Sequence, residues 1–148
     1  MQTSPIADIA RVIQLSIAPV FLISGIAALL SVLSGRLARL VDRARILERL
    51  VAAEENDHAA AHEELGILSR RSKLIYRAIA LGTSSALLIC FVIASLFISA
   101  LARYPISNIV GALFIAAMLA LIAALLFFLR EVFLATRTLR IGVISQAP

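Results

Sequence analysis

A cluster of charged side chains follows the first long apolar stretch of the sequence. Its members are Arg36, Arg39, Asp42, Arg43 and Arg45. On a helix, Asp42 is spaced to pair with Arg39 or Arg45. One interpretation is a salt-bridged stem whose long side chains extend toward water. The other is a site for the phosphates of anionic lipid headgroups. The two interpretations are compatible, and both are kept.

Two histidines, His58 and His62, are four residues apart and have acidic neighbours. This spacing on one helix face can chelate a transition metal. A turn is expected near residues 56–58, however, so His58 stands at the very edge of a helix. A solvated turn with ordinary surface residues is therefore the favoured interpretation. No metal and no other cofactor is predicted.

Polar groups within the apolar stretches include Gln14, Ser24 and Ser31, which are candidates for lining a pore. The serines can instead bond back to their own helix, and this is the favoured interpretation. No Asp, Glu, Lys or Arg lies in the middle of an apolar stretch, which argues against a proton-coupled transporter. No phosphate-binding loop, dinucleotide fingerprint, zinc-protease motif or Ser/Cys nucleophile with a positioned histidine is present. We therefore predict no enzyme.

Three long stretches of the sequence contain no Asp, Glu, Lys or Arg, and the candidate residues named above lie within or beside them. They cover residues 12–35, 78–102 and 104–129. About 20 residues cross the bilayer core as a helix, so each stretch suffices. With 61% hydrophobic residues and a mean hydropathy of +1.00, we predict an all-α membrane protein with transmembrane helices at 12–35, 78–102 and 106–129. The net charge of +5 does not indicate nucleic acid, because the basic residues flank apolar spans and face lipid headgroups there.

The distribution of basic residues predicts the orientation. Nine Lys or Arg residues lie in the connection 36–77 and three in the tail 130–148, against only Arg11 and Arg103 on the opposite side. Cytoplasmic segments carry the excess of Lys and Arg. We therefore expect a cytoplasmic connection, a cytoplasmic C-terminal tail and a periplasmic N-terminus.

The connection 36–77 has two matching apolar patterns with alternating steps of four and three. Their positions are Leu33, Leu37, Leu40, Ala44, Leu47 and Val51, followed by Ala61, Leu65, Leu68, Ser72, Ile75 and Ile79. This spacing is typical of a coiled coil. Antiparallel pairing about residue 57 brings Ala44 opposite Ser72 and Asp42 opposite Lys73. We predict that the first two transmembrane helices continue into a coiled-coil hairpin; an amphipathic segment on the membrane surface is the alternative.

Small residues recur every four positions on the third stretch, at Ala112, Ala116, Ala120 and Ala124. Ala27, Ser31 and Gly35 share this spacing on the first stretch. Such rows allow helices to approach closely in lipid. They can pack within one chain or between copies, and we expect a homo-oligomer.

The sequence resembles the bacterial membrane family known as domain of unknown function 2721. The resemblance is carried by Ile13-Gln14-Leu15, Ala18-Pro19-Val20-Phe21-Leu22, Arg36-Leu37-Ala38-Arg39 and Asp42-Arg43-Ala44-Arg45. It is strongest over residues 9–50 and looser through Arg70-Arg71 and the later spans. It implies a bacterial inner-membrane location and a three-span layout. It implies no activity and adds no functional residue.

Three functional hypotheses follow. The first is a homo-oligomeric scaffold or interaction protein that acts through its cytoplasmic hairpin on a protein partner of unknown identity. The second is a small homo-oligomeric ion channel with residues 12–35 lining the pore. The third is an accessory subunit of a larger membrane complex.

Overall fold

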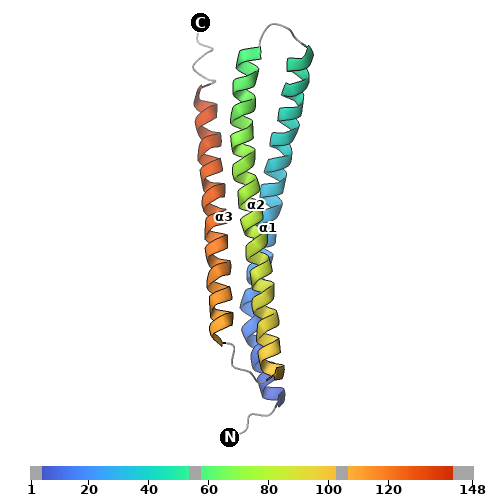
Figure 1. Ribbon diagram of the computed structural model, residues 1–148, viewed down its shortest axis with the longest axis vertical. Coiled ribbons are helices and arrows are strands. Elements are labelled where there is room, and N and C mark those ends of the chain that lie inside the picture. The colour runs from blue at the N-terminus through green and yellow to red at the C-terminus, as the bar shows by residue number, and fades with distance from the viewer. Residues whose placement is uncertain (1–4, 54–57, 103–106, 142–148) are drawn as a thin grey trace. The chain divides into compact units, whose positions relative to one another are not determined.

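Three long helices make up the described part of the chain. The computed structural model describes residues 5–53, 58–102 and 107–141. The helices are α1 (Pro5–Ala53), α2 (His58–Ala102) and α3 (Ser107–Ile141), shown in Figure 1. The segments Ile9–Arg49, Glu63–Leu101 and Ser107–Thr136 are each long and apolar enough to cross a membrane. The predicted all-α fold is confirmed for the described residues, with three helices that could each span a membrane.

The first two helices continue well past their apolar stretches, as predicted. α1 has 49 residues and runs through Pro19 without ending, and α2 has 45. A helix satisfies its own backbone hydrogen bonds, which lipid cannot do, so an apolar stretch favours helix. The predicted turn falls largely on residues 54–57, outside the described residues, and α2 begins at His58. α3 extends to Ile141, so a helix continues into the segment that the sequence indicated only as a tail.

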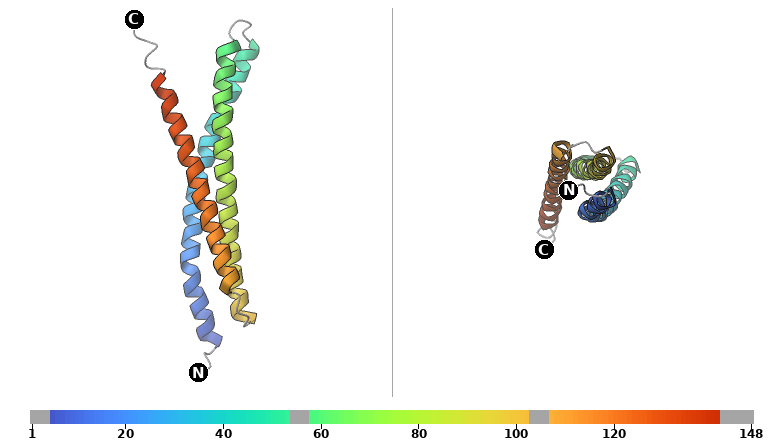
Figure 2. Two further views of the ribbon diagram at one scale, coloured as in Figure 1. Left: turned by 60° about the vertical axis from the view of Figure 1, so that its left-hand side comes forward. Right: turned by 90° about the horizontal axis from the view of Figure 1, so that it is seen from below.

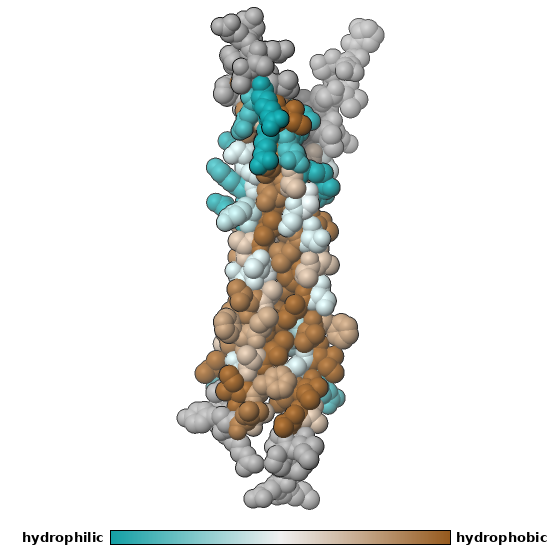
Figure 3. All heavy atoms as spheres, turned by 90° about the vertical axis from the view of Figure 1, so that its right-hand side faces the viewer, coloured by the Kyte–Doolittle hydropathy of each residue, from teal (hydrophilic) through white to brown (hydrophobic). Residues whose placement is uncertain are grey.

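The chain divides into two compact units, each containing part of every helix. Residues 1–30 and 81–122 form one unit, here called the apolar unit. Residues 31–80 and 123–148 form the other, here called the stem unit. Hydrophilic side chains gather in one zone of the face shown in Figure 3, and hydrophobic ones cover another.

The apolar unit packs around small and branched side chains. Its buried core consists of Ile26 from α1, Ile89 from α2 and Ala117 from α3. The hydroxyl of Ser85, which is fully buried, donates a hydrogen bond of 2.8 Å to the carbonyl oxygen of Ala117. A methyl group added at Gly82 would lie 3.1 Å from Cδ2 of Leu30. The helices therefore approach closely where residues are small, as expected for packing in lipid.

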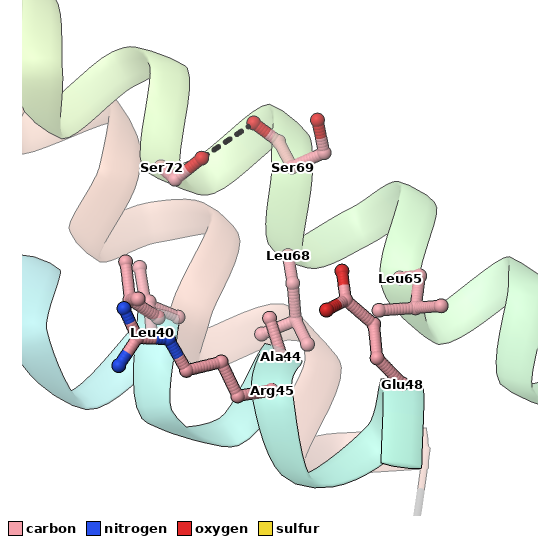
Figure 4. A pocket seen from close by; sticks show the side chains of 9 residues that line it. Leu40, Ala44, Arg45, Glu48, Leu65, Leu68, Ser69 and Ser72 are labelled. Atoms are coloured by element: carbon pink, nitrogen blue, oxygen red, sulfur yellow. Dashed lines mark hydrogen bonds between the residues drawn. The ribbon is translucent and has the colours of Figure 1, made fainter. Parts of the chain in front are cut away.

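In the stem unit, three side chains of the two apolar patterns are buried, and most of the others are half-buried. Leu33, Leu68 and Ile75 are buried, whereas Asp42 is exposed. α1 and α2 run side by side through this unit (Figure 1, Figure 2). The predicted partners Ala44 and Ser72 line one pocket of about 470 Å³, together with Leu40, Val41, Arg45, Glu48, Leu65, Leu68 and Ser69 (Figure 4). Small side chains at this level leave the space that larger ones would fill.

Candidate functional site

A buried carboxylate in the stem unit binds two arginines from two other helices. Glu131 of α3 has only 1% of its side chain exposed. Its Oε2 accepts a hydrogen bond of 2.8 Å from Nη1 of Arg36 on α1. Its Oε1 accepts one of 2.8 Å from Nη2 of Arg71 on α2. A buried charge is tolerated when it is paired and hydrogen-bonded, and both carboxylate oxygens are satisfied here. Glu131 therefore joins all three helices of the stem unit.

Two aromatic rings of α3 lie beside arginines of the other helices. The guanidinium carbon of Arg36 is 5.4 Å from the centre of the Phe128 ring. That of Arg77 is 6.0 Å from the centre of the Phe127 ring. A guanidinium at such a distance is attracted to the negative face of the ring. Phe128 and Glu131 thus both interact with the same arginine, Arg36.

A pocket of about 340 Å³, here called the arginine pocket, lies beside the buried carboxylate. Its lining residues are Arg36, Arg39, Leu40, Arg43, Arg71 and Glu131. Arg43 also donates from Nε (2.8 Å) and Nη2 (2.6 Å) to Oε1 of Glu64, in a pair that is largely exposed. Nε of Arg71 is buried and has no hydrogen-bond partner among the described residues. Four cationic side chains therefore surround a space that holds one carboxylate.

The arginine cluster predicted from the sequence is divided between two places in the stem unit. Arg36, Arg39 and Arg43 line the arginine pocket, whereas Arg45 lines the pocket near Ala44. Asp42 and Lys73 are both exposed. Among the described residues they form no ion pair, and the carboxylates that do pair with arginine are Glu64 and Glu131.

The other candidate residues are distributed as follows. The polar side chains Gln14, Ser24 and Ser31 are exposed on α1. Of the alanine row on α3, Ala112 and Ala116 are exposed, Ala120 is half-buried and Ala124 is buried. On α1, Ala27, Ser31 and Gly35 are exposed.

Both histidines of the predicted pair belong to α2. The side chains of His58 and His62 lie outside the described residues. Within the part of the chain that the structure describes, no group of three or more His, Cys, Asp or Glu side chains is arranged to hold a metal ion.

Glu131 is the candidate site residue that the sequence pattern did not indicate. It lies two positions beyond the third charge-free stretch, so a search for charges inside the stretches passes over it. One signal was available, because Glu131 is the only acidic residue in residues 65–148. A single carboxylate among several basic residues at the end of a span is expected to find a cationic partner.

The sequence pattern of the family described as Protein of unknown function (DUF2721) matches residues 16–141. This covers most of the chain, which therefore belongs to that family and confirms the expected resemblance. The family description assigns no activity. No curated protein matches the chain, and neither does any solved structure.

Proposed function

We propose that this member of the DUF2721 family is a multi-pass membrane protein that assembles into homo-oligomers and acts as a scaffold through its stem. The observation that carries the proposal is the buried Glu131, bonded at both oxygens to arginines of the two other helices. Breaking a buried pair leaves an uncompensated charge, so such a cluster holds its helices in one arrangement. A stem fixed in this way suits a protein that presents a surface to partners.

The stem surface offers apolar side chains to a partner. Val41, Ile46 and Tyr76 are exposed on α1 and α2 in this unit. Tyrosine and arginine are among the residue types enriched where proteins bind one another. The exposed Arg43–Glu64 pair lies in the same unit and adds a polar component.

Exposed small residues support assembly with further copies. Ala112 and Ala116 on α3, and Ala27 and Ser31 on α1, are not covered by their own chain. In lipid the association of helices depends on close packing, which small side chains allow. We propose that a second copy covers these rows.

The proposed orientation follows from the Lys and Arg distribution. Residues 36–77 carry nine of the chain's 14 Lys and Arg residues, which favours a cytoplasmic hairpin in the bacterial inner membrane and a periplasmic N-terminus. A cysteine substituted at Asp57 is then protected from membrane-impermeant reagents added from the periplasm. Labelling from the periplasmic side would show that the orientation is the opposite of the one proposed.

A homo-oligomeric channel is a second candidate. One observation favours it, because Gln14, Ser24 and Ser31 are all exposed on α1 and are available to a pore between copies. Proteoliposomes distinguish the two functions. A scaffold gives no ion flux at any voltage or membrane tension, whereas a channel conducts and loses conductance when Gln14 or Ser24 is replaced.

The oligomer is tested by native mass spectrometry of the full chain released from detergent. We expect the wild type to be oligomeric and Ala116→Leu to shift it toward monomer, because a leucine prevents close approach of the helices. Ala94→Leu makes the same change at an exposed position of α2, outside the two rows, and should remain oligomeric. A monomeric wild type, or equal behaviour of the two variants, contradicts the proposal; a monomer favours an accessory subunit of a larger complex.

A further inference from the structure

We infer that the arginine pocket of the stem unit binds a phosphate group, either the headgroup phosphate of an anionic phospholipid or inorganic phosphate. The pocket has a volume of about 340 Å³ and is lined by four arginines, one glutamate and one leucine. Small-molecule sites start at about 300 Å³, so one phosphate-bearing group is a suitable occupant. The site does not depend on whether the protein oligomerises.

Sequence spacing brings three of the arginines together. Arg36, Arg39 and Arg43 are three and four residues apart, which places them on one face of α1. Arg71 of α2 completes the lining. Guanidinium groups present several N–H donors in a plane and match the oxygens of phosphate in a bidentate manner. Phosphate is therefore the anion that this set of side chains fits best.

The pocket contains more positive charge than the chain neutralises. Glu131 pairs with Arg36 and Arg71, and Glu64 pairs with Arg43 in an exposed ion pair. Arg39 is exposed and forms no ion pair among the described residues. Two carboxylates thus pair with three of the four arginines of the pocket. One of them, Glu64, is in an exposed ion pair, which water weakens. An anion in the pocket would balance the excess.

The Glu131 carboxylate orders two of the pocket's arginines before an anion binds. It accepts hydrogen bonds of 2.8 Å from Nη1 of Arg36 and from Nη2 of Arg71. Both guanidinium groups are therefore fixed, so that little ordering is required when the anion binds.

The position of the pocket along the chain suits a lipid headgroup. Arg36 directly follows the charge-free stretch 12–35, and Glu131 lies two residues after the stretch that ends at 129. If these stretches span the bilayer core, their ends lie at the level of the headgroups. Anionic lipids attract basic groups at this level on the cytoplasmic side.

The test compares Arg39→Gln with Arg70→Gln in the full chain. Both remove one exposed arginine from the stem unit, but only Arg39 lines the pocket. In the lipid arm, protein is taken from nanodiscs of phosphatidylcholine mixed with phosphatidylglycerol, and retained phosphatidylglycerol is measured by native mass spectrometry. In the phosphate arm, inorganic phosphate is titrated calorimetrically into protein held in phosphatidylcholine nanodiscs.

We expect Arg39→Gln to weaken binding by about tenfold, the loss of one charge-assisted hydrogen bond. Arg70→Gln should change binding by less than about twofold, because salt screens exposed charges that do not touch the ligand. An effect confined to the lipid arm identifies a headgroup, and an effect in the phosphate arm identifies inorganic phosphate as a ligand. Equal losses in the two variants, or no loss in either arm, would overturn the inference.

Discussion

The interactions inside the apolar unit differ from those inside the stem unit. The apolar unit has a core of Ile26, Ile89 and Ala117, and a buried hydrogen bond from Ser85 to a backbone carbonyl. The stem unit is built around a buried carboxylate with two arginine partners. The same three helices contribute to both units, so the difference comes from side chains rather than from backbone.

This difference predicts which kind of substitution destabilises each unit. A core of small and branched apolar side chains depends on shape, because its close packing leaves no room for added atoms. A buried charge depends on its partners, because it is tolerated only when it is paired and hydrogen-bonded. Changes of volume should therefore damage the apolar unit, and changes of charge should damage the stem unit.

The largest effect is expected from removing the buried charge of the stem. Glu131→Gln should reduce the stability of the stem unit by about 3 kcal/mol, because it leaves two arginines without their carboxylate. That is the lower end of the usual range for buried pairs, since Arg36 and Arg71 are 34% and 20% exposed. Amide hydrogen exchange in α1 and α2 of the stem unit measures the change.

Glu48→Gln is the matched control. Glu48 is an exposed carboxylate on α1 in the same unit, and its replacement should change exchange by less than about 0.5 kcal/mol. If both substitutions alter exchange equally, Glu131 has no special role in the stem. If Glu131→Gln opens the apolar unit as much as the stem unit, the division between the units is wrong.

A smaller effect is expected from a change of volume in the apolar unit. Ala117 is fully buried, and its carbonyl accepts the bond from Ser85. Ala117→Leu adds bulk to a packed core, which typically costs about 1 to 3 kcal/mol. Faster exchange confined to the described residues of the apolar unit, 5–30, 81–102 and 107–122, would show it. Ala94→Leu, at an exposed position on α2, should leave exchange there unchanged.

Periodicity predicted the helical layout, because apolar length and heptad spacing are local properties of the chain. The three membrane-length helices, and the burial of Leu33, Leu68 and Ile75, follow from these patterns. The end of α3 was harder to predict. The sequence marked residue 129 as the end of a charge-free stretch, but helix formation does not require an apolar residue at each position, and α3 continues to Ile141.

The charged site was predicted only in part. Arg36, Arg39 and Arg43 were identified because they lie close together in sequence. Glu131, the partner of Arg36, is 95 residues away in the sequence, and this pairing depends on how α3 packs in the stem unit. Local spacing also favoured Asp42 as the partner carboxylate, yet Asp42 is exposed. A choice between two carboxylates that depends on burial cannot be made from spacing alone.

The most direct test of the stem is a double-mutant cycle between Arg71→Gln and Glu131→Gln, read from hydrogen exchange in the stem unit. Contacting partners should show a coupling of about 1 to 3 kcal/mol, because either single change already removes the pair. The exposed pair Arg43–Glu64 provides the control cycle and should give less than about 1 kcal/mol. A coupling at Arg71–Glu131 no larger than that control would contradict the claim that a buried carboxylate holds the stem together.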